Sequence, residues 1–150
     1  MSQRKNQRFV QLHFDLLDAP AWLAMGLAAR CTYVALKRQF NGKNNGEVFL
    51  SHRDAAVGLS LARTTIARAF LELEYYGFIV MTSPGRLGLD GKGRAPHWRL
   101  TEIDTADAPA TMDFKSWDKT PFKPPPRPTK KKKRATRPRR QSEMQPEIGR

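Results

Sequence analysis

The chain has 150 residues, and its 27 Lys and Arg side chains outnumber 14 Asp and Glu side chains, which gives a formal net charge of +13 at pH 7. This excess of positive charge predicts a polyanionic partner. A single cysteine excludes an internal disulfide scaffold, and no apolar run approaches the roughly 20 residues that a membrane-spanning helix needs.

The N-terminal part of the chain predicts an extended segment. The first eight residues are polar and basic and lack the apolar stretch of a signal peptide, so we expect a flexible N-terminus (residues 1–8) on a cytoplasmic protein. Residues 9–17, FVQLHFDLL, alternate roughly between apolar and polar side chains. This alternation predicts a short extended lead-in that packs on the domain.

A first helical unit is predicted for residues 18–40. Asp18 is placed to cap it, and Pro20 falls in the first turn, where its missing N–H has no partner to lose. Gly26 interrupts the pattern and is expected to divide a short helical turn from a longer helix, because glycine disfavours a helix interior. The run NGKNNG that follows, residues 41–46, predicts a loop.

Two more helices follow in the pattern. EVFL, residues 47–50, is a β-rich run, and Ser51 with Asp54 three residues later resembles a capping box, so a short second helix begins here and extends to about Leu59. A third helix ends at Gly77, a natural left-handed C-cap. Its apolar side chains recur on one helical face, at Ile66, Ala69, Phe70 and Leu73.

Two strands are predicted at residues 78–82 and 97–102, joined by a connection that contains four glycines and two prolines. The complete order is helix, strand, helix, helix, strand, strand. That is the winged-helix order, in which a small antiparallel sheet packs against three helices around one core. The sequence therefore predicts an α+β, winged helix-turn-helix domain over residues 9–105.

The second and third predicted helices have the spacing of a helix-turn-helix. This motif needs a small residue where the helices touch, a bend four positions later and a branched apolar anchor, and Ala56, Ser60 and Ile66 have that spacing. The start of the third helix then projects outward, which is the part that enters the major groove. Arginine can bind guanine O6 and N7 together, and threonine can meet a base edge or a thymine methyl. The candidate recognition-helix residues are Ala62, Arg63, Thr64, Ala67 and Arg68.

The stretch LSHRDAAVGLSLARTTIARAFLELEYYGFI, residues 50–79, resembles the winged helix-turn-helix proteins of bacterial plasmids, phages and related mobile elements. The match extends over residues 9–102 and is strongest over residues 71–79. The family commonly has glycine at the bend and Ser or Thr as the cap of the recognition helix, where this chain has Ser60 and Ala62. If Ser60 is itself the cap, the helix begins earlier and the contacts rotate by a residue or two. The resemblance implies duplex DNA binding by a protein associated with the bacterial nucleoid, as a transcriptional regulator or a replication-initiation protein.

The connection between the two predicted strands carries basic residues in the place of a wing. In the functional interpretation these side chains contact phosphates or enter a minor groove. The alternative is that they only keep a glycine-rich loop soluble. The candidate wing residues are Arg86, Lys92 and Arg94.

Apolar periodicity is lost from Thr105 onward, and proline, lysine and arginine dominate much of residues 106–150, which predicts a disordered tail. Phe114 and Trp117 are expected either to dock on the domain or to meet a partner. The tail either strengthens DNA binding through its charge or only aids solubility. Its candidate DNA-binding residues are Lys130, Lys131, Lys132, Lys133, Arg134, Arg137, Arg139 and Arg140.

The sequence contains no catalytic pattern. No histidine pair has metal-ligand spacing, and the run GRLGLDGKG lacks the spacing of a phosphate-binding loop. We therefore expect no enzymatic activity, no cofactor and no metal.

The predicted function is sequence-specific duplex DNA binding by a transcriptional regulator. Two alternatives stay open: a plasmid or phage replication-initiation accessory whose tail recruits a replication or transcription protein, and a protein-interaction or RNA-binding module. A homodimer built through the first helix is also compatible with the sequence, and no membrane partner is expected.

Overall fold

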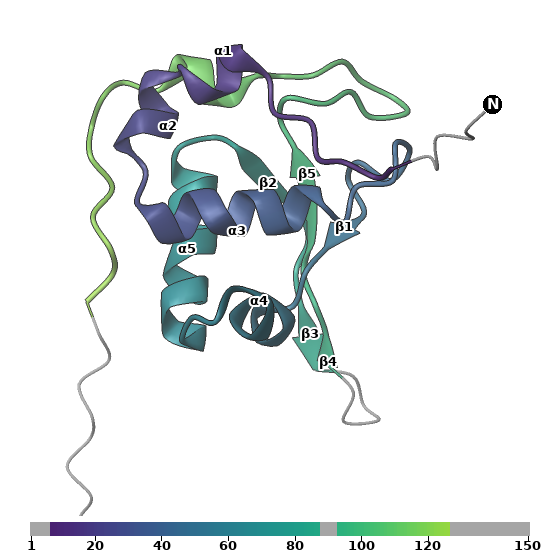
Figure 1. Ribbon diagram of the computed structural model, residues 1–150, viewed down its shortest axis with the longest axis vertical. Helices are drawn as coiled ribbons and strands as arrows, with labels where there is room; N and C mark the ends of the chain where they lie inside the picture. The colour runs from purple at the N-terminus through teal and green to yellow at the C-terminus, as the bar shows by residue number, and fades with distance from the viewer. Residues whose placement is uncertain (1–6, 88–92, 127–150) are drawn as a thin grey trace, which may run out of the picture.

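The computed structural model describes residues 7–87 and 93–126, and within these ranges it contains five α-helices and five short strands (Figure 1). The helices are α1 (Phe14–Leu17), α2 (Pro20–Ala24), α3 (Leu27–Lys37), α4 (His52–Leu59) and α5 (Arg63–Tyr75). The strands are β1 (Val48–Phe49), β2 (Ile79–Ser83), β3 (Arg86–Leu87), β4 (Gly93–Arg94) and β5 (His97–Leu100), followed by a 3-10 turn, η1 (Asp113–Ser116). No helix in the described ranges is long and apolar enough to cross a membrane.

Three strands form an antiparallel sheet in the order β1-β5-β2. The central strand is β5: Trp98 pairs with Val48 on one side, and Leu100 pairs with Ile79 on the other. Strands β3 and β4 form a separate antiparallel ladder within the connection between β2 and β5. The predicted α+β class is confirmed, and α1 is a helix that the sequence did not predict.

The core lies between this sheet and the helices, with α3 and α5 packed on each other (Figure 1). At its centre the rings of Trp22, Tyr33 and Phe78 meet edge to face, with each pair of ring centroids 5.7 Å apart. The ring of Phe70 stacks on Trp98 at 5.2 Å. Aromatic pairs of this kind contribute about 0.5–1.5 kcal/mol beyond the area that they bury.

Local signals near the first helices are partly confirmed. Gly26 divides the first helical unit, since α2 ends at Ala24 and α3 begins at Leu27, and Pro20 is the first residue of α2. Asp18 is not the cap of that unit, and the extended lead-in is replaced in part by α1. The reason is Leu16, which is 1 % exposed: a helical turn at this point directs it into the core.

Helix α5 ends before Gly77, as predicted, and this glycine has two functions. Its backbone has a φ of 79°, which favours glycine in the turn that ends the helix. In addition, a Cβ atom at this position would lie 2.8 Å from the carbonyl carbon of Asp113 and 2.9 Å from the nitrogen of Phe114. A later part of the chain therefore packs directly against the end of α5.

That later part is a segment that the sequence predicted to be disordered. We call residues 113–122 the C-terminal strap. Phe114 is 2 % exposed, and its ring stacks on Phe78 with 4.8 Å between centroids. The domain boundary predicted at residue 105 is therefore corrected to a position after the strap, and docking is observed for Phe114 and Trp117. A few separated aromatic side chains bury enough area to order a segment without any periodic pattern.

A buried carboxylate connects the end of the sheet to α3. Glu102 follows β5 and accepts hydrogen bonds from the Tyr33 hydroxyl and the Lys37 ammonium. Burial, the charge of Glu102 and this hydrogen bond all raise the pKa of Tyr33. The second predicted strand was too long by two residues, because β5 ends at Leu100 and Glu102 lies inside the fold.

Candidate nucleic-acid interface

Helices α4 and α5 are joined by a short turn, and the residues that flank each helix set where it begins and ends. The Ser51 hydroxyl accepts a hydrogen bond from the Asp54 N–H at 3.0 Å, so Ser51 caps α4 as predicted. The reciprocal bond differs from that of a capping box, because the Asp54 carboxylate accepts from the Ser51 hydroxyl at 2.6 Å and not from the Ser51 backbone N–H. Ser60 ends α4 in the left-handed conformation, with a φ of 54°. The alternative in which Ser60 caps α5 is wrong, because α5 begins at Arg63 and Ala62 occupies its N-cap position. The predicted outward positions therefore keep their register.

The inner face of α5 anchors the helix. Ile66, Ala69 and Leu73 are fully buried, and Phe70 is nearly so. Ala56 is buried on α4, and small side chains at positions 56 and 69 allow close packing between helices. Since every predicted anchor is in the core, the outer face of α5 is held in a fixed position.

The outer face of α5 carries the predicted recognition residues. Ala62, Arg63, Thr64 and Arg68 are exposed, and Ala67 is half-buried on the same side. Among the described residues, no carboxylate forms an ion pair with Arg63 or Arg68. The Ala62 side chain cannot cap the first N–H groups of α5, so these donors have no side-chain partner at the N-cap position.

The β3–β4 hairpin adds two more cations. Arg86 and Arg94 are direct cross-strand partners, and both are exposed. Two like charges opposite each other destabilise a hairpin by themselves. An anion placed between or beside them removes that repulsion, so this pair suits a phosphate. Lys92 lies outside the described residues.

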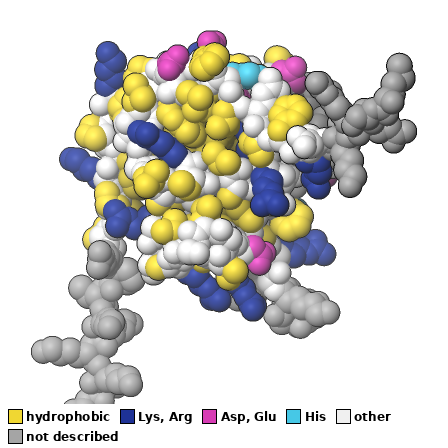
Figure 2. Space-filling view, viewed as in Figure 1, with side chains coloured by type: hydrophobic (Ala, Val, Ile, Leu, Met, Phe, Trp, Pro, Cys, Tyr) yellow, Lys and Arg dark blue, Asp and Glu magenta, His cyan; other side chains and the backbone are white. Residues whose placement is uncertain are grey.

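The start of α5, the helix α4 and the β3–β4 hairpin occupy the same end of the molecule, the lower end in Figure 1. Figure 2, in the same orientation, shows Lys and Arg side chains along this lower edge. The start of α5, with the predicted recognition residues Ala62, Arg63 and Thr64, therefore lies at the same end of the molecule as the hairpin that carries Arg86 and Arg94. All eight basic tail residues of the sequence prediction, from Lys130 to Arg140, lie outside the described residues.

Two side chains in the first turn of α4 were not among the predicted DNA-binding residues. Arg53 is exposed there. Its exposure could be predicted from the Ser51 cap, because the cap sets where α4 begins and so places Arg53 off the face that carries the buried Ala55 and Ala56. The His52 ring packs 5.0 Å from that of Phe70. Partial burial lowers the pKa of His52, so its imidazole is neutral near pH 7 and adds no charge to this end.

Comparisons of the chain with protein-family models, with curated proteins and with solved structures found no match. In the described part of the chain, no three His, Cys, Asp or Glu side chains gather at a distance that would hold a metal ion.

Proposed function

We propose that this protein binds duplex DNA sequence-specifically, with α5 as the recognition helix of a winged helix-turn-helix and the β3–β4 hairpin as its wing. Regulation of transcription is the biological role that we propose for this binding. A role as a replication-initiation accessory would use the same surface, and capture of a replicative helicase or its loader by the full chain would favour it.

One observation carries the proposal: Arg63 and Arg68 are exposed, without a carboxylate partner in the described chain, on a helix whose inner face is fully packed. Two cations elsewhere in the domain do have carboxylate partners. Lys115 lies 3.5 Å from the Asp15 carboxylate, and Arg99 lies 4.0 Å from that of Asp113. Arg86 and Arg94 on the hairpin also lack a carboxylate partner in the described residues, so four unpaired cations are available to an anionic ligand.

The chemistry of this surface fits the DNA major groove. A groove about 12 Å wide admits an α-helix, and arginine binds the guanine edge with two parallel hydrogen bonds. The small side chains of Ala62 and Ala67 let the backbone of α5 approach the bases. The free N–H groups at the start of α5 suit a phosphate, and so do Arg86 and Arg94 on the hairpin.

The test is selection from a random pool of duplex DNA by the full chain at near-physiological salt. We expect one enriched motif, and its symmetry reports whether two copies bind together. The double variant Arg63→Ala/Arg68→Ala should lose the motif. A matched control, Arg38→Ala/Lys43→Ala, removes the same charge from exposed positions at the end of α3 and in the following loop and should keep it.

The proposal is wrong if the wild-type chain enriches no motif or if the recognition-helix variant enriches the same one. Competition with an RNA duplex of the selected sequence separates the alternative partner. The major groove of A-form RNA is too narrow for side chains to read, so the RNA should not displace the DNA. A truncated form for these assays should end at Pro126 and not at Thr105, because Phe114 belongs to the core.

A further inference from the structure

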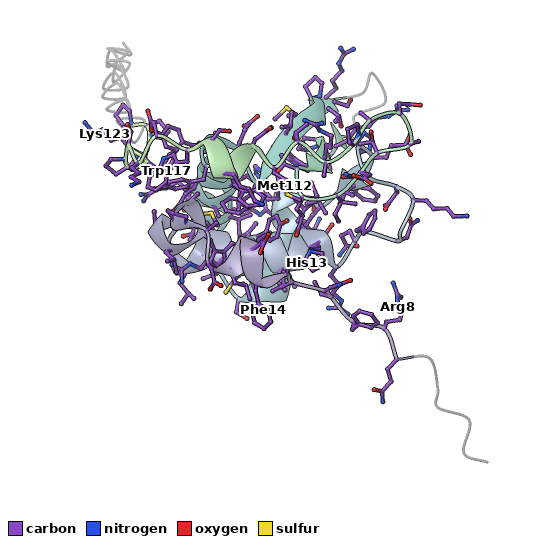
Figure 3. All side chains as sticks on the ribbon, turned by 90° about the horizontal axis from the view of Figure 1, so that it is seen from above. Arg8, His13, Phe14, Met112, Trp117 and Lys123 are labelled. Atoms are coloured by element: carbon purple, nitrogen blue, oxygen red, sulfur yellow. The ribbon has the colours of Figure 1, made fainter. Side chains whose placement is uncertain are left out.

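An open groove lies between α3 and α4, and Trp22 of α2 and Leu50, just before α4, also form part of its wall. Its volume is about 550 Å³. In Figure 1 the two helices lie at the front of the molecule, and Figure 3, seen from above, places the first helices along the lower edge and the strands toward the upper one. Because Arg38 and Gln39 in its wall are exposed, the groove opens to solvent on the helical side of the domain.

The wall of the groove is mostly apolar. Helix α3 contributes the half-buried Cys31, Val34 and Ala35, and α4 contributes Ala55 and Leu59. Figure 2, in the orientation of Figure 1, shows hydrophobic side chains gathered over this face of the molecule. Sites for small organic molecules are typically clefts of about 300–1,000 Å³ with apolar walls and a few polar groups. The size and the lining of this groove are those of such a site.

Gly58 leaves space on the α4 side of the groove. It lies inside α4, where glycine is less favourable than alanine, and its φ is not positive. A Cβ atom at this position would meet no atom of the described chain within 4 Å. Neither a left-handed turn nor close packing therefore accounts for glycine here. The property that glycine provides is open space beside the helix.

Arg30 supplies a polar group that the fold does not satisfy. It is half-buried in the groove wall, and its Nη2 donates a hydrogen bond to the Leu23 carbonyl at 2.8 Å. Its Nε is buried and has no hydrogen-bond partner in residues 7–87 and 93–126, and no carboxylate in these ranges forms an ion pair with it. An unpaired buried donor is unfavourable. A carboxylate satisfies a guanidinium well, because it can accept two parallel hydrogen bonds.

The charges of the groove favour a ligand with one negative charge. Arg38, the residue that ends α3, is a second cation in the wall. Asp54 is the only carboxylate among the described lining residues, and it already accepts a hydrogen bond from the Ser51 hydroxyl at 2.6 Å. The wall therefore carries a net charge of 2 − 1 = +1. One carboxylate on a ligand balances it.

We propose that the α3–α4 groove binds a small monocarboxylic acid with an apolar body. The carboxylate pairs with Arg30, and the body packs against the apolar wall and occupies the space beside Gly58. Helix α4 contacts both α3 and α5, so the site is one helix away from the proposed recognition helix. The inference goes beyond the proposed function and does not depend on it.

The experiment titrates the ¹⁵N-labelled full chain with 4-phenylbutanoate and follows the backbone amide signals by nuclear magnetic resonance. The uncharged probe with the same body is 4-phenylbutan-1-ol. Both molecules have about a dozen non-hydrogen atoms, for which a dissociation constant on the order of 1 mM is expected. We expect the acid to bind saturably and to shift amide signals of α3 and α4. The alcohol should bind at least about tenfold more weakly, because it lacks the ionic hydrogen bonds.

Two variants separate the charge of the groove from its shape. Arg30→Met removes the guanidinium and should lower the affinity for 4-phenylbutanoate to that of the alcohol. Gly58→Leu fills the open space and should remove the shifts caused by either probe. The matched controls are Arg53→Met and Val57→Leu, at exposed positions of α4 that do not line the groove, and both should bind 4-phenylbutanoate as the wild type does.

Thermal melting shows whether each variant is folded. Gly58→Leu should melt no lower than the wild type, because leucine favours a helix more than glycine does and meets open space at this position. The amide shifts of the wild type give the location of the site without any variant.

Three results with the wild type overturn the inference: no saturation at about ten times the expected dissociation constant, equal affinity for the acid and the alcohol, or shifts that cluster outside α3 and α4. A folded Arg30→Met or Gly58→Leu variant that binds 4-phenylbutanoate as tightly as the wild type also overturns it. None of these results bears on DNA binding by α5, so the two proposals can fail separately.

Discussion

The two ends of α5 are built in opposite ways. At its start, Arg63 and Arg68 are exposed without a described carboxylate partner, and no side chain caps the first N–H groups. At its end, Glu72 accepts a 2.6 Å hydrogen bond from the Gly26 N–H at the beginning of α3, and the hydroxyls of Tyr75 and Tyr76 are hydrogen-bonded to the strap. One helix thus has an end that stabilises the fold and an end that is free to bind.

This contrast predicts that DNA affinity and folding stability depend on different ends of one helix. Substitutions at the strap end should lower the free energy of unfolding with little effect on the DNA affinity of the folded molecules. Substitutions at the start of α5 should lower DNA affinity with little effect on the free energy of unfolding. Four sets of substitutions test that separation.

Phe114→Ala should have the largest effect on stability. Removal of a buried phenylalanine typically costs about 3–5 kcal/mol, and this ring stacks on Phe78 in the core. Urea unfolding measures the loss, and Phe14→Ala, at an 81 % exposed position, should change the free energy of unfolding by less than about 0.5 kcal/mol. Equal unfolding midpoints for the two variants would show that the strap is not part of the core.

Arg68→Ala should lower specific DNA affinity by about 1–3 kcal/mol and relax the motif at one position, because one bidentate contact is lost. Glu74→Ala removes an exposed charge from the other end of the same helix and should leave the motif unchanged. Binding titrations on the selected duplex and on a scrambled one measure both effects. A loss of folding stability in Arg68→Ala would contradict the separation of the two ends.

Arg86→Ala/Arg94→Ala should weaken binding to all duplexes alike. The negative slope of log K against log salt should become shallower by about 0.9 for each phosphate contact that is lost. Because the variant also removes two opposed like charges, its folding stability should stay equal or rise by a few tenths of a kcal/mol. Titrations at several salt concentrations, together with thermal melting, measure the pair of effects, and a sequence-dependent loss would assign base contacts to the hairpin.

The smallest expected effect is a pH dependence at His52. Burial lowers the pKa of this side chain from its ordinary value of 6.5, so the unfolded chain binds the proton more readily than the folded one. The stability contributed by neutral His52 is complete above pH 6.5 and is lost as the pH falls through the lower, folded-state pKa. His52→Gln should flatten this part of the stability curve between about pH 7 and pH 5. Identical curves for the variant and the wild type would show that burial does not lower the pKa of His52.

The elements that the sequence predicted well are those with local signals. The Ser51–Asp54 cap, the break at Gly26 and the stop at Gly77 each depend on a few neighbouring residues, and the structure has all three. The anchors of α5 were equally visible, because their spacing repeats along a single helix. Once the buried anchors are identified, the remaining positions of α5 are the ones that face outward. Their role in DNA binding stays a prediction.

The parts that the sequence missed depend on distant partners. Phe114 is one aromatic residue in a segment with no period, and its partner Phe78 lies 36 residues earlier, so nothing nearby predicts the stack. Glu102 appeared to be the end of a strand, and only the fold brings Tyr33 and Lys37 to it. Asp18 had the right residue type for a helix cap, but burial of Leu16 in α1 set the local conformation instead.

The conformation of Ser60 bears on the rigidity of the α4–α5 turn. Serine has fewer backbone conformations open to it than glycine, and the left-handed one costs it energy, so the conformation of Ser60 is held by the packing of α4 and α5 on the core. The angle between the two helices is therefore set when the protein folds, at an energetic cost of roughly 1 kcal/mol for the strained residue. Little conformational freedom is left for α5 to lose on contact with a ligand, so the turn lowers the entropic cost of binding by fixing the helix orientation in advance.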